Sequence, residues 1–187
     1  FGTELSPKSS WYLHRRRRRA AGRRRPSRRT ISAYRLRHRD QRLLRHEYDI
    51  RGRQLRNAVN EAAHLGGDSA ENLVKVLEQR LDALVRRAGF APTVSRARKM
   101  VDHNHFTVDG GKVNRPGYQV HPGETIEVRK SRRERRPFVA ASERRPAVPP
   151  YLEVEPAQLR ATLAREPAKD EVPVLGKEQF VVEPTRR

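Results

Sequence analysis

Ten arginines fall within the fifteen positions 15–29, and this spacing is the strongest chemical signal in the chain. A guanidinium carries a permanent charge and a planar fork of donors that contacts phosphate oxygens bidentately and stacks on unpaired bases. The run therefore predicts binding to phosphate groups. Its arginines are Arg15, Arg16, Arg17, Arg18, Arg19, Arg23, Arg24, Arg25, Arg28 and Arg29.

The net charge supports a polyanionic partner, because 42 Lys and Arg stand against 22 Asp and Glu, a formal charge of +20. Residues 1–39 hold 14 of the basic residues and one acid, Glu4. We expect this segment to be a basic arm that is disordered until phosphates neutralise it. The alternative is a solvated tail that binds nothing, which such a dense run of like charges disfavours.

Nucleic acid is the polyanion that the composition favours. A membrane is the other candidate, but no segment approaches the ~18 apolar residues of a spanning helix, and the basic stretches have no apolar face. We expect no signal peptide, because the cationic run is followed by more arginine rather than by an apolar stretch. The lack of cysteine excludes disulfides and thiolate metal sites, and it agrees with a reducing cytosol.

A second set of basic residues lies between positions 80 and 129. Three of them, Arg96, Lys99 and His103, are spaced three and four apart, so they share one face of a helix. The opposite face carries the apolar residues Ala97, Met100 and Val101. We predict that the following residues bind RNA: Arg80, Arg86, Arg87, Arg96, Arg98, Lys99, His103, His105, Lys112, Arg115 and Arg129.

Two short patterns could indicate other chemistry. His103 and His105 could form half of a metal site, but a third ligand at a suitable spacing is missing. Arg80-Leu81-Asp82 resembles the catalytic motif of RNA pseudouridine synthases, yet Asp82 is predicted to lie within a helix, where it can pair with Arg86. We find no catalytic triad, phosphate loop or paired carboxylates, and we expect no cofactor, no metal and no enzymatic activity.

In the first part of the chain, apolar residues recur with the period of a helix. We predict an exposed helix over 34–48 and a second helix from Leu55 that ends at Gly66-Gly67. A third helix should be capped by Asp68, continue to Ala88 and end at Gly89. A short helix after Pro92 should end at Asn104.

The pattern then changes from helical to alternating. We predict a strand at 105–108, a turn at Asp109-Gly110, a return strand at 112–114 and a last strand at 125–128. Residues 131–150 are interpreted as an extended basic connection. A last helix should begin at Pro156 and carry Leu159 and Leu163 on one side. The apolar tail at 180–182 should dock on another surface.

These elements predict an α+β protein. We divide it into the basic arm (1–39), a helical domain (40–77) that residues 131–187 complete, and an RNA-binding module (78–130) of two short helices and a twisted antiparallel sheet. Residues 131–187 are the basic connection and C-terminal segment.

About fifty residues in order resemble the RNA-binding module of the bacterial ribosomal protein S4 family. They include Arg80-Leu81-Asp82, Gly89-Phe90-Ala91, Ala97-Arg98, the stretch 103–114, Pro116, Tyr118, Val120, Pro122-Gly123 and Ile126-Glu127-Val128. Leu5-Ser6-Pro7-Lys8 and the tail at 173–183 are similar to the cysteine-free form of that family.

Three positions depart from the family pattern. The arginines at 15–25 replace a segment that contains Pro-Pro-Gly, so the contacts of that loop cannot be transferred. Asn104 stands where the family has glycine, a mild change at a left-handed position. Val94 stands where arginine is common, with Arg96 two positions later.

The resemblance implies a structural protein of the small ribosomal subunit. Its partners would be the five-prime domain of 16S ribosomal RNA, which it binds early in assembly, the neighbouring proteins S3 and S5, and messenger RNA near the region that affects accuracy. It would be cytoplasmic and ribosome-bound, without a membrane partner. Two alternatives stay open: an RNA-modifying enzyme with the same module, and a non-specific binder of nucleic acid.

Overall fold

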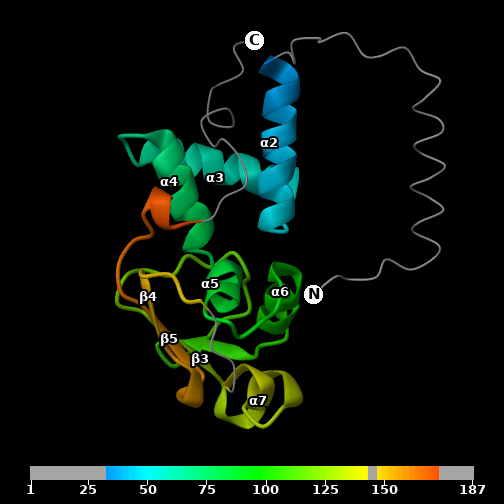
Figure 1. Ribbon diagram of the computed structural model, residues 1–187, viewed down its shortest axis with the longest axis vertical. Coiled ribbons are helices and arrows are strands. Elements are labelled where there is room, and N and C mark those ends of the chain that lie inside the picture. The colour runs from blue at the N-terminus through cyan, green and yellow to red at the C-terminus, as the bar shows by residue number, and fades with distance from the viewer. Residues whose placement is uncertain (1–32, 143–146, 173–187) are drawn as a thin grey trace, which may run out of the picture. The chain divides into compact units, whose positions relative to one another are not determined.

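The computed structural model describes residues 33–142 and 147–172, and these form the predicted α+β architecture (Figure 1). The helices are α2 (Ala33–Glu47), α3 (Gly52–His64), α4 (Ser69–Glu78), α5 (Leu81–Arg87), α6 (Val94–Asp102) and α7 (Arg136–Ser142). The strands are β1 (Phe106–Val108), β2 (Gly111–Lys112), β3 (Thr125–Val128), β4 (Leu152–Glu155) and β5 (Arg160–Leu163). Short 3-10 helices are η1 (Lys130–Arg132), η2 (Pro156–Gln158) and η3 (Lys169–Glu171). The ten clustered arginines and the tail at 180–182 lie outside the described residues.

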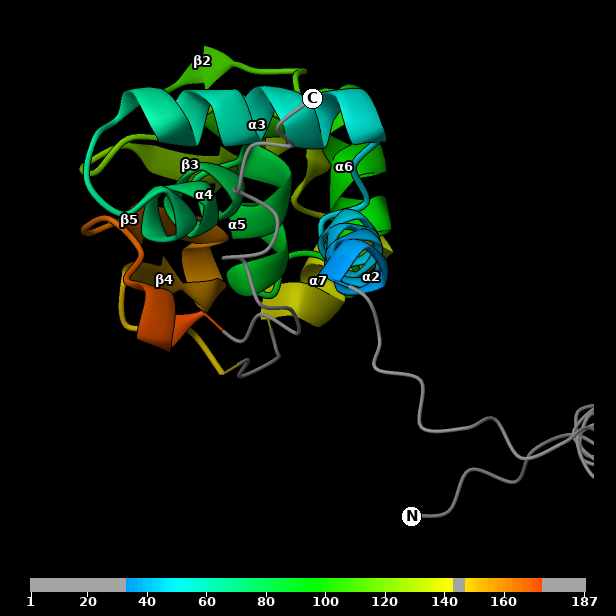
Figure 2. The same ribbon diagram turned by 90° about the horizontal axis from the view of Figure 1, so that it is seen from above.

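Helices α2, α3 and α4 bury one apolar cluster. Leu44 of α2 and Tyr48, the residue after α2, pack with Leu55 of α3 and with Leu73 and Leu77 of α4. α3 and α4 lie side by side (Figure 2). The glycines Gly66 and Gly67 separate them as predicted, with φ angles of 72° and 76° that other residues rarely adopt. None of the helices in the described ranges has the length and apolar content that crossing a membrane requires.

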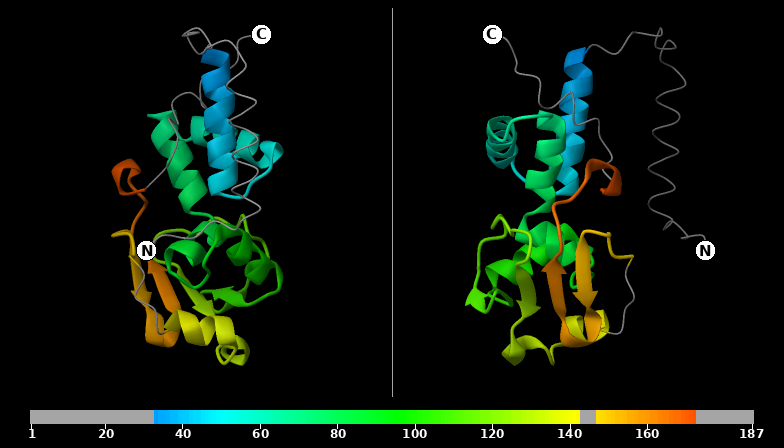
Figure 3. Two further views of the ribbon diagram at one scale, coloured as in Figure 1. Left: turned by 45° about the vertical axis from the view of Figure 1, so that its right-hand side comes forward. Right: turned by 90° about the vertical axis from the view of Figure 1, so that its left-hand side faces the viewer.

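The strands form one antiparallel sheet in the order β2-β1-β3-β5-β4. The predicted hairpin is confirmed: Thr107 pairs with Lys112, and the turn residues Asp109 and Gly110 have φ angles of 46° and 78°. Such positive φ angles at both central residues match the right-handed twist of the two strands. β4 and β5 complete the side of the sheet opposite the hairpin (Figure 3).

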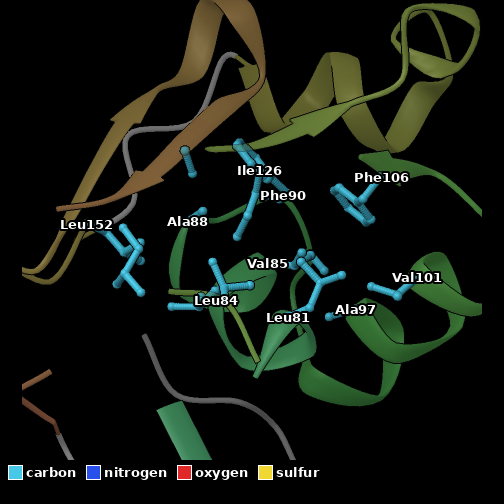
Figure 4. Packing of buried hydrophobic residues seen from close by; sticks show 14 of the residues in the cluster. Leu81, Leu84, Val85, Ala88, Phe90, Ala97, Val101, Phe106, Ile126 and Leu152 are labelled. Atoms are coloured by element: carbon cyan, nitrogen blue, oxygen red, sulfur yellow. The ribbon is translucent and has the colours of Figure 1, made fainter. Parts of the chain in front are cut away.

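The larger core lies between this sheet and helices α5 and α6. Leu84 and Val85 of α5, Ala97 and Val101 of α6, and Phe106 and Ile126 of the strands are all buried in it (Figure 4). Fully burying a leucine or phenylalanine side chain contributes about 1.5–3 kcal/mol. The core therefore holds α6 firmly, and with it the basic residues on the other face of this helix.

The prediction of a single helix from Asp68 to Ala88 is wrong, because two helices form there. Gln79 is the C-cap of α4, and Arg80 before α5 is extended and forms a β-bridge with Gln119. The Val120 N–H donates to the Gln79 carbonyl at 2.9 Å, and the Leu81 N–H donates to the Tyr118 carbonyl at 2.9 Å. Both helices bury an apolar stripe, so the spacing of apolar residues in the sequence continues across the break between them. The break therefore cannot be recognised from this spacing.

Two predictions for the C-terminal segment are also wrong. Residues 131–150 are not all extended, because η1 and α7 form within them and Phe138 of α7 is buried in the core. The helix that begins at Pro156 is only the 3-10 helix η2, which leads to Leu159, with a φ of 52°, and then to β5. Leu159, Ala161 and Leu163 are buried at alternate positions, which is the period of a strand.

Candidate nucleic-acid interface

The helix α6 presents basic side chains on one face, as predicted. The Thr93 hydroxyl accepts a hydrogen bond from the Arg96 N–H at 3.2 Å and caps the start of the helix. Ala97, Met100 and Val101 are buried, whereas Arg96, Lys99 and His103 are exposed. Within the described residues, no hydrogen bond or ion pair occupies the side chains of Arg96 and Lys99.

The segment that follows β3 adds further positive charge beside α6. Arg132 and Arg135 lie close enough to His105 to act on its charge, together with His103 and Arg96. The ring of Phe138 in α7 packs edge-on against His105 at a centroid distance of 5.6 Å, which fixes this segment to the module. We call Arg96, Lys99, His103, Arg132 and Arg135 the cationic face.

His105 lies beneath the cationic face, with only 8% of its surface exposed. Burial lowers the pKa of His105 below its usual value, and Arg135, Arg132, His103 and Arg96 lower this pKa further. Its Nδ1 atom is buried and has no hydrogen-bond partner among the described residues. The arrangement favours a neutral imidazole, because protonation would bury one more charge among cations.

We predict that His105 makes the free energy of unfolding fall with acidity. The unfolded state binds a proton near pH 6.5, the usual pKa, whereas the folded state binds it only at lower pH. Stability from this residue is therefore complete above about pH 6.5 and is lost as the pH falls toward the lowered pKa of His105. Urea titrations between pH 7.5 and 5 measure this slope.

The matched variants are His105→Phe and His64→Phe, the second at an exposed position in the last turn of α3. The loss of stability between pH 7.5 and 5 should become smaller in His105→Phe and stay at its wild-type size in His64→Phe. An unchanged loss in His105→Phe would assign the acid sensitivity to other groups.

Several arginines predicted to bind RNA form ion pairs within the protein. Arg80 is 7% exposed, and its Nε and Nη2 donate to both carboxylate oxygens of Asp82 at 3.0 and 2.7 Å. The predicted pair of Asp82 with Arg86 is wrong, because Asp82 lies in the first turn of α5 beside Arg80. Arg86 is paired with Glu47 at 3.3 Å.

Arg87 belongs to a buried cluster around Glu78, a residue for which no role was predicted. Its Nε and Nη2 donate to the two carboxylate oxygens of Glu78 at 3.0 and 2.6 Å. The hydroxyls of Tyr48 and Tyr151 donate to the same oxygens at 2.7 and 2.9 Å. We call these four residues the Glu78 cluster, and Glu78 itself is 0% exposed.

The Glu78 cluster joins four parts of the chain. Tyr48 follows α2, Glu78 ends α4, Arg87 ends α5, and Tyr151 precedes β4. Burial raises the pKa of both tyrosines, and the negative charge of Glu78 raises it further. Both hydroxyls therefore remain protonated donors, and the carboxylate is fully satisfied.

The remaining predicted residues lie at other places on the module. The Arg98 Nη1 donates to the Asp49 carbonyl at 2.8 Å. The Arg98 side chain also lines a polar hollow, together with Arg45 and Arg51. The Arg129 Nη1 donates to the Asn104 carbonyl at 3.1 Å. The side chains of Lys112 and Arg115 are exposed at β2 and just after it.

Sequence reasoning missed Arg132 and Arg135, because the segment was interpreted as an extended connection. The apolar Phe138 three residues after Arg135 was the available signal that this segment packs on the module. In the described part of the chain, no three His, Asp or Glu side chains are grouped as metal ligands would be.

Comparison with known proteins found two family models that match consecutive parts of the chain. Residues 4–78 match the family described as Ribosomal protein S4/S9 N-terminal domain, and residues 79–126 match the S4 domain. The small ribosomal subunit protein uS4 of Micrococcus luteus and that of Bifidobacterium adolescentis are each 43% identical to this chain. Each similarity covers 97% of this chain and 90% of the relative. The chain belongs to the ribosomal protein S4 family.

Proposed function

We propose that this protein is a structural constituent of the small ribosomal subunit that binds ribosomal RNA. The curated relatives are ribosomal proteins, so the chain is a binding protein and not an enzyme. The single observation that carries RNA binding is the cationic face. Its exposed groups Arg96, Lys99 and His103 lie on α6 and at its C-cap, and the other face of this helix is locked into the core.

The physical task that suits this surface is to hold converging phosphates. RNA helices repel one another where their backbones meet, and fixed cations offset that repulsion. Because the cations lie on a rigid frame, they favour one arrangement of phosphates over others, and shape is read more than sequence. The proposed arm, helical domain and module would each contribute charge to this contact.

The specific RNA and protein partners that we propose follow from the family resemblance. The partner would be the five-prime domain of 16S ribosomal RNA, bound early in subunit assembly. The proteins S3 and S5 would be neighbours, and the protein would lie where messenger RNA reaches the subunit and affect accuracy. It would work in the cytoplasm on the ribosome.

Sedimentation of a bacterial lysate that contains the tagged chain tests this function. We expect the protein to travel with small ribosomal subunits at low and moderate salt, and to leave them at high salt as phosphate counterions return. Sedimentation only as free protein at low salt would contradict the proposal.

A further inference from the structure

A small hollow opens between α6 and α7, next to the cationic face. It has a volume of about 220 Å³ and is lined mainly by apolar groups. Phe90 and Met100 line it from the core, where they are 3% and 5% exposed. Pro92, Pro137 and Ala140 are exposed lining residues, and Arg96 also contributes to the wall.

The surroundings of this hollow are positively charged. Arg96 lines it, and the exposed Arg135 and Arg136 directly precede the lining residue Pro137. The structure shows no hydrogen bond or ion pair to these three guanidinium groups from any described residue. An apolar wall beside unpaired cations fits a ligand that joins a flat apolar part to an anion.

We propose that this hollow receives one unstacked nucleobase of the bound RNA, whose flanking phosphates contact Arg96 and Arg135. This inference rests on the RNA-binding function proposed above. A nucleobase has an apolar face that favours aromatic and aliphatic walls, and its nucleotide carries the negative charge that the surroundings require. An apolar side chain of a protein would leave the three arginines unpaired.

The test fills the hollow without removing charge. Ala140→Phe adds an aromatic ring at an exposed lining position, and Ala164→Phe adds the same ring at an exposed position after β5. The probe is the transcribed five-prime domain of 16S ribosomal RNA, titrated at two salt concentrations. Because stacking one base contributes at least fivefold in affinity, Ala140→Phe should lose about that factor or more.

The salt dependence of binding and the chemical protection of the RNA give two further tests of the hollow. The salt dependence of binding should change little in Ala140→Phe, because the variant keeps every basic side chain, including Arg96 and Arg135. Wild-type protein should protect one unpaired nucleotide from base-specific modification. An RNA that lacks this base should bind the wild type as weakly as intact RNA binds Ala140→Phe, and the two changes together should cause no further loss.

Several results would overturn the inference. If Ala140→Phe binds the RNA as the wild type does, the hollow is empty or holds a protein segment. If the losses from the variant and from the missing base multiply, the base lies elsewhere. If Ala164→Phe loses as much as Ala140→Phe, the effect is unspecific. Failure of the wild type to prefer this RNA would overturn the proposed function as well.

Discussion

Replacing Glu78 with alanine should lower the free energy of unfolding by about 3–5 kcal/mol, the cost of removing one partner from a buried ion pair. The variant leaves the guanidinium of Arg87, whose side chain is 10% exposed, without its carboxylate. It also removes the acceptor of the Tyr48 and Tyr151 hydroxyls. Urea denaturation followed by circular dichroism measures the change.

The matched control is Glu71→Ala in the same helix, where the carboxylate is exposed. This control should change the free energy of unfolding by less than about 1 kcal/mol. Tyr151→Phe should cost about 1.5–3 kcal/mol, because one hydrogen bond to a buried, charged carboxylate is lost. A loss in Glu78→Ala no larger than that in Glu71→Ala would show that the cluster does not hold these elements together.

A second large effect is expected when cations of α6 are removed, because the protein should then distinguish less well between its cognate RNA and an unrelated duplex. Replacing Arg96 and Lys99 with alanine should weaken binding to the cognate RNA more than binding to an unrelated duplex. These cations are exposed, unpaired among the described residues and mounted on a helix fixed by the core. Each phosphate contact contributes on the order of 1 kcal/mol.

Arg98 is left out of this variant because its Nη1 donates to the Asp49 carbonyl, so its removal would also affect the fold. Arg165→Ala with Lys169→Ala is the control, since it removes the same charge from the C-terminal segment, where Arg165 already pairs with Glu171. The control should keep the wild-type selectivity.

Neutralising Arg15–Arg19 should have a different result. Such a dense run acts mainly through the number of phosphates that it neutralises, so affinity for cognate and unrelated RNA should fall by similar factors. The salt dependence should also become weaker. If the arm variant loses selectivity while the α6 variant keeps it, the arm is the specific element and the cationic face is not.

The sequence was sufficient where one local signal decided the structure. The glycines after α3, the Asp109-Gly110 turn and the two faces of α6 were all predicted, because each depends on residues within a few positions. The Asn104 φ of 56° also agrees with its predicted left-handed conformation. Family resemblance then indicated how these pieces combine.

The sequence failed where distant segments compete for the same backbone groups. The break at Gln79 depends on hydrogen bonds with residues 118–120, about forty positions away. The strand β5 depends on its pairing with β3, in which Ala161 faces Ile126. Local periodicity cannot report such partners, since Leu159 and Leu163 are compatible with both a helix and a strand.

The same limit applies to the candidate site. The charge of a basic residue is recognised from the sequence, but its partner in the fold is not, so the buried carboxylates that hold Arg80 and Arg87 were not predicted. Arg132 and Arg135 were left out because the fold of their segment was not recognised. The charges available to RNA are those that the fold leaves unpaired.

Selective binding of this protein to folded small-subunit RNA can be measured by a titration of the wild-type chain. The five-prime domain of 16S ribosomal RNA and a scrambled duplex of equal length are each titrated at several salt concentrations. We predict tighter binding to the ribosomal RNA at every salt, with log affinity falling steeply and linearly against log salt concentration. Equal affinity for the two RNAs, or an affinity that does not depend on salt, would contradict the account.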